Sequence, residues 1–332
     1  MQYGPVIDTP PKKPAELRAH AVSNDTVTID TWRDTWVKNM QANAEKFDFA
    51  ANSIGQLWGT QQYKPVLVAG SGPSLKRNIG QLKDRREMCL VSCLHNFHFM
   101  EDNEVAPEYY VTLDAGPIVI DEVFAGGKHS PEHYWELTKN RTLLAYIGSP
   151  PELFEKWQGK VLWFSCPVSD QTYLQTIEKL NFNVFVSTGG NVLGAAMYIA
   201  KGFMGANPVV FVGADFSFDN YDIDKPRFHP WDSSYDEKMG NCVRLVDVYG
   251  NAVPSWPSYA GFKSWFDHIA SAVCPGLWFN CTEGGCLGAY PEGNISAFKT
   301  MDLADFYRMY FMNDEMEEQA KNPATEERKL LF

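Results

Sequence analysis

The chain has 332 residues, a formal net charge of -12 and seven scattered cysteines. This length accommodates one large α/β domain with additions, or two domains, without disulfide staples. The acidic balance argues against a protein that wraps nucleic acid, because binding to the phosphate backbone relies on clustered Lys and Arg.

The cysteine spacing and the hydropathy pattern indicate the cellular compartment in which the protein is expected. An odd number of cysteines without paired C-x-x-C spacing indicates neither a disulfide framework nor a structural zinc site. The N-terminal stretch has no signal-peptide pattern, and no later stretch approaches the ~20 apolar residues that span a bilayer. We therefore expect a soluble, cytoplasmic protein that is neither secreted nor membrane-spanning, and that is free to form oligomers.

Residues 1–63 are expected to form an N-terminal arm and an amphipathic helix. Residues 1–25 are rich in Pro and polar residues, which is typical of an extended or poorly ordered arm. From Thr28 to about Phe47, apolar residues recur at helical spacing: Trp32, Trp36, Met40 and Ala44. This pattern predicts one amphipathic helix that packs on the domain behind it.

Residues 64–290 are expected to form a Rossmann-like, nucleotide-binding domain. Short runs within this segment are continuously apolar: 65–70, 88–93, 109–114, 142–148, 160–165 and 208–213. Continuous rather than alternating runs predict strands that are buried on both faces, as in a parallel sheet covered by helices. A helix of small and apolar residues is expected over 191–205. The predicted fold class is therefore α/β, with a doubly wound, mostly parallel sheet.

A long insertion follows the last of these runs. Residues 214–241 are polar, Asp-rich and aromatic without a periodic pattern, and a loop of that length is usually either functional or disordered. A short hairpin around Gly250 and Asn251 comes next, so we expect a lid-like insertion over 214–257. The remaining predicted elements are a helix over 258–272, a strand over 277–280, and a C-terminal helix and tail within 291–332.

Glycines and hydroxyl residues connect the first predicted strand to a helix. Gly70, Ser71, Gly72 and Ser74 stand where successive backbone N–H groups, beside the positive end of a helix dipole, can bind a phosphate. The turn matches neither the P-loop of ATP-hydrolysing proteins nor the complete NAD fingerprint. A plain strand-to-helix turn, in which glycine supplies a positive φ, explains the pattern equally well.

A second turn of this kind consists of Thr188, Gly189 and Gly190, directly before the helix that begins at Asn191. Ordinary N-capping by a hydroxyl also explains this turn when it is taken alone. Both turns, however, are expected at the carboxyl edge of the parallel sheet, where ligands bind in open α/β folds. The pair therefore predicts one nucleotide site.

Polar side chains stand at the ends of other predicted strands. Asn96 follows the second strand and Asp114 ends the third, and such positions commonly contact ribose hydroxyls or a base edge, although a helix cap also accounts for Asn96. Asp215 ends the sixth strand and is a catalytic candidate. His229 lies in the long insertion, where a neutral imidazole can take a proton from an acceptor hydroxyl or can simply be solvated.

Two further groups of residues carry less specific signals. Thr282 and Glu283 follow the last strand, where they are candidates for contacts with substrate hydroxyls or form a glycine-rich turn with a capping Glu. The insertion contains three acidic residues close together in the sequence, Asp219, Asp222 and Asp224. The glycine and the distal Glu of an EF-hand are missing, so these residues indicate a solvated loop. We therefore predict no metal site.

Several blocks in a fixed order resemble a known family. The blocks are VLVAGSGPSL, YYVTLDAG, STGGNVLGAAMYIAKGFMGANPVVFVGADFSF, a downstream His and FNCTEGG, and they run from about Lys64 to Gly288. Together they resemble the motility accessory factor and 6-hydroxymethylpterin diphosphokinase MptE-like family. The first and third blocks are also similar to small bacterial sialyltransferases, which have Asn where this chain has Ser71.

The resemblance implies a metal-independent transferase that binds a cytidine nucleotide, with CMP-activated nonulosonic acids as donors in flagellin-modifying relatives. It also implies roles by position. The residues matched to the donor phosphate or ribose are Gly70, Ser71, Gly72 and Ser74; those that complete the nucleotide pocket are Asp114, Thr188 and Gly189; and the acid/base candidate is His229.

We therefore expect a glycosyltransferase-like protein that moves a nonulosonic or sialic-acid-type sugar from a CMP-activated donor to a hydroxyl. The acceptor, a glycan or a protein, is not identified, and no cofactor beyond the donor substrate is expected. One alternative is a pterin pyrophosphokinase, which would need ATP, Mg²⁺ and a positive side chain such as Lys76 or Arg77. The other is a non-catalytic nucleotide-binding or assembly protein that retains the fold.

Overall fold

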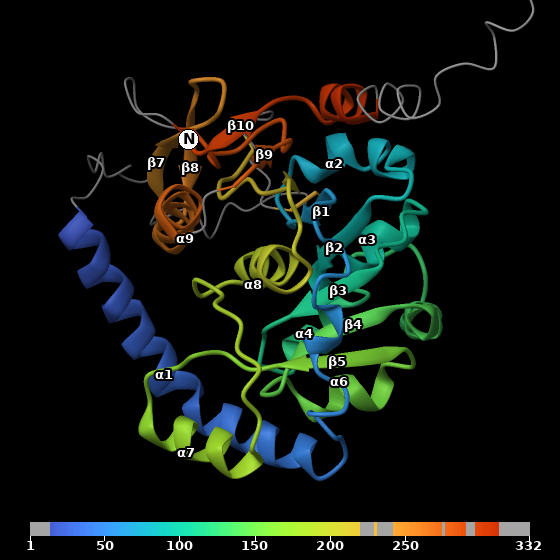
Figure 1. The fold of residues 1–332 in the computed structure, drawn as a ribbon, viewed down its shortest axis with the longest axis vertical. Coiled ribbons are helices and arrows are strands. Elements are labelled where there is room, and N and C mark those ends of the chain that lie inside the picture. The colour runs from blue at the N-terminus through green and yellow to red at the C-terminus, as the bar shows by residue number, and fades with distance from the viewer. Residues whose placement is uncertain (1–13, 220–228, 231–241, 274–275, 290–295, 312–332) are drawn as a thin grey trace, which may run out of the picture.

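The central element is a parallel sheet of eight strands in the order β10-β9-β6-β1-β2-β3-β4-β5 (Figure 1). This computed structural model describes residues 14–219, 229–230, 242–273, 276–289 and 296–311. The strands are β1 (Val66–Ala69), β2 (Cys89–Cys93), β3 (Tyr109–Thr112), β4 (Thr142–Tyr146), β5 (Lys160–Phe164), β6 (Val209–Val212), β9 (Trp278–Asn280) and β10 (Phe298–Thr300). The predicted α/β, Rossmann-like class is confirmed.

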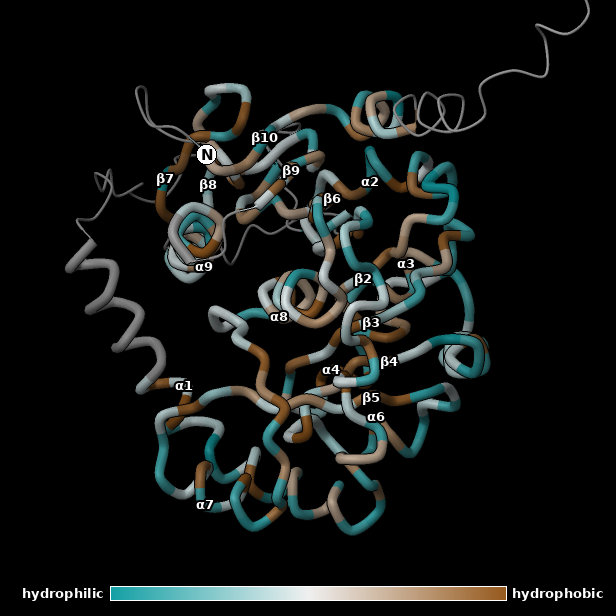
Figure 2. Tube along the Cα trace, in the orientation of Figure 1, coloured by the Kyte–Doolittle hydropathy of each residue, from teal (hydrophilic) through white to brown (hydrophobic). Residues whose placement is uncertain are grey.

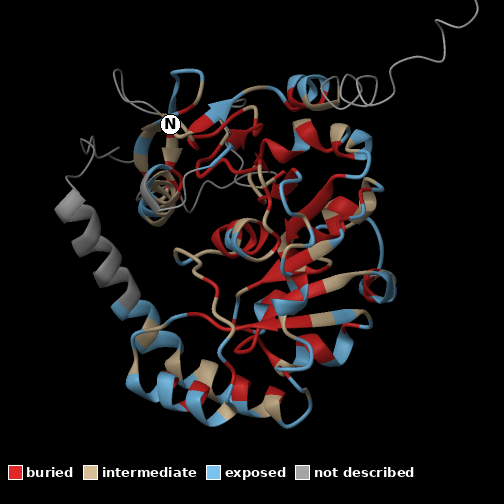
Figure 3. Ribbon diagram, in the orientation of Figure 1, coloured by how far each residue is buried: buried red, intermediate tan, exposed pale blue. Residues whose placement is uncertain are grey.

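The central strands have apolar side chains on both faces, as is typical of a parallel sheet. In β1, β2 and β6 every residue is buried (Figure 3), and the tube coloured by hydropathy follows the same pattern (Figure 2). Such strands need helices on both faces of the sheet to exclude water from them. Val66 of β1 pairs with Cys89 of β2 on one side and with Val209 of β6 on the other.

Short helices connect the strands. They are α2 (Leu75–Asn78), α3 (Phe97–Asp102), α4 (Ile118–Glu122), α5 (Pro131–Leu137), α6 (Pro151–Lys156), α7 (Gln171–Leu180) and α8 (Val192–Tyr198). Tighter turns are η1 (Ile54–Leu57), η2 (Gln81–Asp84), η3 (Leu94–Asn96) and η4 (Thr138–Asn140), and the π segment η5 (Ile199–Phe203) extends α8. Helix α8 packs across β1, β2 and β3, as its small and apolar residues predict.

The N-terminal helix is longer than its apolar pattern predicts. Helix α1 runs from Pro14 to Ala44, so the expected arm over residues 1–25 is wrong from Pro14 onward. Part of the reason is local: Pro is favourable in the first helical turn, and the sequence AELRA at residues 15–19 consists of strong helix formers. The last turns of α1 pack against α6 and α7, where Met40 is fully buried (Figure 1).

Two asparagines fasten α1 to the sheet. Asn39 Nδ2 donates to the carbonyls of Ala115 and Gly148 at 3.1 and 2.9 Å. Asn43 Nδ2 donates to the carbonyls of Ile147 and Ser149 at 3.0 and 2.9 Å, and the Asn43 side chain is fully buried. These bonds satisfy backbone acceptors just beyond β3 and β4, which would otherwise be buried without a donor.

The segment after β6 contains the predicted hairpin. Strands β7 (Val243–Val246) and β8 (Ala252–Ser255) pair antiparallel, and α9 (Pro257–His268) with the π segment η7 (Ile269–Val273) follows. The sheet does not end at residue 290, because β10 pairs with β9 beyond it, and a helix over residues 303–311 comes next. The role of 214–257 as a lid stays a prediction.

The order of the strands reverses at β1. The chain runs outward from β1 through β5 on one side and returns to the other side of β1 with β6. In such sheets the crevice at the carboxyl ends of the two central strands is the usual ligand site. Among the helices described, none is long and apolar enough to cross a membrane.

Replacing Asn43 with Ala should destabilise the protein by about 2–4 kcal/mol, because two buried carbonyls lose their donor. Chemical denaturation measures the free energy of unfolding. Gln41→Ala on the exposed face of the same helix is the control and should change it by less than about 0.5 kcal/mol. Equal effects of the two substitutions would contradict the proposed role of Asn43.

Candidate functional site

A cavity of about 330 Å³ lies at the carboxyl ends of β1, β2, β3 and β6. It occupies the point where the strand order reverses, as expected for a ligand site of this fold. Of the predicted site residues, those that line it are Gly70, Ser71, Gly72, Asp114, Gly190, Asp215 and His229. Residues far apart in the sequence are therefore brought to one opening. Their roles in binding and catalysis stay predictions.

The first turn needs glycine because the ends of β1 and β6 pack closely against each other. A Cβ on Gly70 would lie 2.5 Å from the Gly213 carbonyl oxygen, and a Cβ on Gly213 would lie equally close to that of Gly70. A Cβ on Gly72 would overlap the Asp215 carboxylate. Neither Gly70 nor Gly72 has a positive φ, so the alternative explanation, in which glycine supplies a positive φ, does not apply to this turn.

The backbone N–H groups of this turn are largely used within the protein. Gly70 N–H donates to Val212 O and Gly72 N–H donates to Gly213 O, each at 2.9 Å. Ser74 N–H donates to Asp215 Oδ1 at 3.2 Å. In this structure β6 and Asp215 therefore occupy the N–H groups of Gly70, Gly72 and Ser74, and the phosphate contact of the turn stays a prediction.

The second glycine turn leads into the N-terminus of α8. Gly189 and Gly190 have φ values of 58° and 81°, the left-handed region that glycine tolerates. Thr188 Oγ1 accepts a hydrogen bond from Gly190 N–H, while the N-cap is Asn191, whose Oδ1 accepts from Gly194 N–H at 2.8 Å.

Within the second turn, Gly190 lines the cavity, whereas Thr188 and Gly189 are not among its lining residues. Val192 and Leu193 line it too. Their N–H groups belong to the first turn of α8 and have no carbonyl partner within the helix. This end of α8, rather than the first turn, offers backbone donors to an anion in the cavity.

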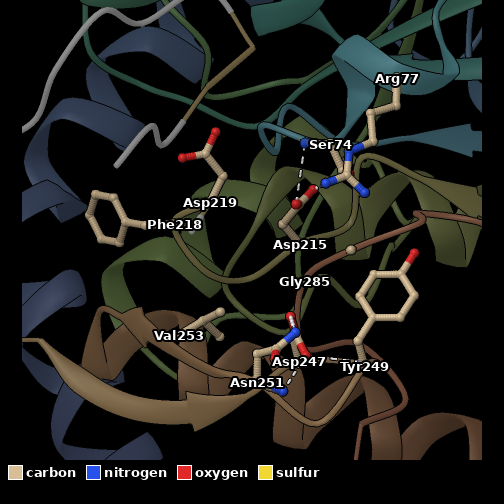
Figure 4. A pocket seen from close by; sticks show the side chains of 11 residues that line it. Ser74, Arg77, Asp215, Phe218, Asp219, Asp247, Tyr249, Asn251, Val253 and Gly285 are labelled. Atoms are coloured by element: carbon tan, nitrogen blue, oxygen red, sulfur yellow. Dashed lines mark hydrogen bonds between the residues drawn. The ribbon is translucent and has the colours of Figure 1, made fainter. Parts of the chain in front are cut away.

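The Asp215 side chain lines both this cavity and a second one of about 220 Å³, which is drawn in Figure 4. It is almost fully buried and accepts a hydrogen bond of 2.6 Å from Ser74 Oγ. Burial raises the pKa of Asp215 to about 7, although the Ser74 hydroxyl and amide favour the charged form. Ser74 thus holds the Asp215 carboxyl in place; it lines the second cavity and not the larger one.

The second cavity lies between the start of α2 and the β7–β8 hairpin. Arg77 reaches it from α2, and Tyr249 and Asn251 reach it from the hairpin turn (Figure 4). The Asp247 carboxylate organises that turn by accepting from the N–H groups of Tyr249 and Asn251 at 2.9 and 2.7 Å. Asp219 also lines this cavity, whereas Asp222 and Asp224 lie outside the described residues.

One wall of the larger cavity carries two imidazoles and two carboxyls. His229 Nδ1 lies 2.8 Å from the Ser71 carbonyl oxygen, and its ring centroid is 4.5 Å from that of His95. His95 Nδ1 in turn lies 3.3 Å from Glu122 Oε2. Asp114 is open to solvent in the cavity, yet the dense protein around it and the Glu122 charge raise its pKa to about 6.

Three predicted contact residues have their side chains engaged inside the protein. Asn96 is fully buried and donates to the Gly70 carbonyl at 3.0 Å, so it supports the first turn from below. Thr282 Oγ1 accepts from Ala214 N–H at 3.2 Å. Glu283 Oε1 accepts from Asn78 Nδ2 and from Leu303 N–H, both at 3.0 Å. None of the three lines the larger cavity, and their predicted ligand contacts stay untested.

Sequence reasoning missed several lining residues. His95 and Glu122 are ordinary positions in short helical segments, and nothing in their spacing pointed to the cavity. Tyr259 and Phe262 also line it, and their i, i+3 spacing on α9 was the available signal. Among the described residues, no group of three or more His, Cys, Asp or Glu side chains is arranged to hold a metal ion.

The raised pKa of Asp215 predicts a pH-dependent stability. Between about pH 4 and 7 the unfolded chain releases the Asp215 proton while the folded protein keeps it, so the free energy of unfolding falls as pH rises through this window. In Asp215→Asn this contribution disappears. The stability of the variant relative to the wild type should therefore increase with pH, by at most about 1.4 kcal/mol per pH unit, and level off above pH 7.

Denaturation at several pH values tests this prediction, with the exposed Asp121→Asn as a control of equal charge change. A difference between wild type and Asp215→Asn that stays constant across the window would mean that Asp215 is not held protonated by the fold.

Comparisons with known proteins agree with this architecture. The solved structure of the MAf glycosyltransferase from Magnetospirillum magneticum AMB-1 is similar, with a TM-score of 0.52 and 18% sequence identity over 73% of this chain. This chain spans about a third of that structure, covering 34% of it, and at this identity the likeness concerns the fold. A search of curated protein sequences gives no match.

The comparison with protein families gives a second match. The family described as 6-hydroxymethylpterin diphosphokinase MptE-like matches residues 35–221, which is more than half of the chain. The matched segment contains both glycine turns and the strands from β1 to β6. The chain therefore belongs to the MptE-like family.

Proposed function

We propose that this protein is a transferase that binds a CMP-activated nonulosonic or sialic-acid-type sugar and transfers the sugar to a hydroxyl. One observation carries the proposal: the N-terminus of α8 and the base candidate His229 line the same cavity at the reversal point of the sheet. An anion-binding end and a proton acceptor in one cavity are what a nucleotide-dependent transfer requires. The fold likeness to a MAf glycosyltransferase is consistent with it.

The charges of the cavity suit a nucleoside monophosphate better than a triphosphate. None of its described lining residues is Lys or Arg, so the phosphate would be bound by the N–H groups of Val192 and Leu193. Asp114 lies at the end of β3, where its carboxyl can accept from ribose hydroxyls or an exocyclic amino group. Tyr259 and Phe262 supply aromatic surface on the facing helix α9.

His229 is in the right tautomer to act as a base. The Ser71 carbonyl can only accept a hydrogen bond, so His229 Nδ1 carries the proton in that contact and Nε2 keeps its lone pair. In the proposed reaction Nε2 takes the acceptor's hydroxyl proton while CMP leaves as an anion next to the α8 donors. Asp215, buried beside the cavity, is a second candidate for proton transfer.

A pterin pyrophosphokinase is the alternative that the family description favours. Transfer of pyrophosphate from ATP needs metal ions and positive side chains around three phosphates. Arg77 lines the second cavity and not the larger one, and is the guanidinium that such a reaction would recruit. A non-catalytic nucleotide-binding protein would keep the larger cavity without turnover.

We expect CMP to raise the melting temperature by a few degrees without any divalent metal, because a ligand of the native state stabilises it by mass action. Differential scanning fluorimetry with CMP, and separately with ATP and Mg²⁺, makes the comparison. A shift with ATP and Mg²⁺ but none with CMP would transfer the proposal to the pyrophosphokinase. A shift with neither nucleotide would leave the protein without a nucleotide function.

His229→Asn should lower the single-turnover release of CMP from a CMP-sugar by about 10²–10⁴-fold. The Asn amide can still donate to Ser71 O, so calorimetric CMP affinity should stay nearly unchanged. His133→Asn, which replaces an exposed histidine outside the cavity, is the control. Full activity of His229→Asn would direct attention to Asp215, and joint loss of activity and CMP binding would make His229 a binding residue.

A further inference from the structure

We propose that Glu122 and His95 are positioning residues for His229, in a relay that orients this base and stabilises its protonated form. The inference rests on the proposed transfer reaction. It assigns a role to two residues for which neither the sequence motifs nor the family match gives one.

The relay is built from three structural segments. His95 belongs to η3, directly after β2, and Glu122 is the last residue of α4. His95 Nδ1 lies 3.3 Å from Glu122 Oε2, with both side chains about three-quarters buried. The ring centroids of His95 and His229 are 4.5 Å apart with 51° between the ring planes. All three side chains line the larger cavity.

These contacts favour one proton position on each ring. A carboxylate offers only acceptors, so the contact with Glu122 favours the proton on His95 Nδ1. The Ser71 carbonyl does the same for His229 Nδ1 at 2.8 Å. Both rings are thereby held in one orientation, and His229 keeps the lone pair on Nε2 that a base requires.

The positive charge that forms on His229 during the proposed reaction gives the Glu122 carboxylate its role. The acceptor oxygen forms a bond to the anomeric carbon, and the bond from that carbon to the phosphate oxygen breaks, with its electron pair leaving on CMP. The acceptor's proton moves to His229 Nε2. The imidazolium so formed lies against His95, and Glu122 places a negative charge on the other side of His95 that offsets it.

The other ionisable groups of the cavity act in the same direction. Asp114 faces it from the end of β3 and Asp215 from the end of β6. No Lys or Arg is among the described residues that line it. In their ionised forms, the carboxyls from α4, β3 and β6 all offset a positive charge on the histidine pair. Asp114 and Asp215, whose pKa values are raised to about 6 and about 7, do so only above those pH values.

Glu122→Gln tests the relay because it keeps the side-chain shape and removes the charge. We measure single-turnover release of CMP from CMP-N-acetylneuraminate as a function of pH. The maximal rate should fall roughly tenfold, and the midpoint of the acidic limb should move to lower pH by roughly half a unit or more, because the His229 cation is less stabilised. Glu122→Asp restores the charge and should recover part of both effects.

A matched control disrupts a similar histidine–carboxylate pair outside the two cavities. His129 Nε2 lies 3.8 Å from Asp102 Oδ1, and His129 is half-exposed outside both cavities. His129→Asn should have the wild-type rate and pH profile. A general loss of folding in Glu122→Gln would lower the rate without moving the acidic limb to lower pH, so the direction of the shift distinguishes the two causes.

Two results would overturn the relay. One is a wild type that cleaves the donor while Glu122→Gln keeps both its rate and its profile. The other uses no donor: NMR follows the titration of the His229 imidazole, and a midpoint that is the same in wild type and Glu122→Gln shows that the charges are not coupled. If the wild type neither binds CMP nor releases it from the donor, the proposed function fails, and the NMR titration still decides the relay.

Discussion

The close approach of β1 and β6 at their carboxyl ends is the constraint on which the site depends. Gly70 and Gly213 face each other so closely that a Cβ on either would contact the other's carbonyl oxygen. The Gly70 N–H bond to Val212 O and the Asn96 amide beneath the turn hold this contact. Because the two strands then lead to opposite halves of the sheet, the crevice between their connections stays open.

The buried carboxyl of Asp215 extends this constraint to the rest of the site. It fills the space that Gly72 leaves empty and is held by Ser74, so the first turn and the end of β6 form one packed unit. The same side chain lines both cavities. Burial raises the pKa of this carboxyl to about 7, so its proton is held more tightly than that of an exposed Asp.

The candidate site was predictable where a local pattern marks it and hidden where side chains meet through the fold. Glycines at strand ends pointed to the turns, and the chemistry of an imidazole pointed to His229. His95 and Glu122 gave no signal, because their contact depends on how η3 and α4 are oriented over the sheet. Ser74 and Glu283 carry groups suited to ligands, but partners distant in the sequence, Asp215 and Asn78, engage them.

The strands and the class of the sheet follow from the amino-acid sequence, because continuous apolar runs punctuated by glycine are stable in water only when both faces are covered. The start of α1 also has a local signal, because Pro14 is followed by the strong helix formers AELRA, next to a Pro-rich flank that obscured them. The use of each polar group, by contrast, was set by folding. The N–H of Gly72 had a partner only once β6 lay beside β1, and a hydrogen bond between groups far apart in sequence leaves no periodic trace in the chain.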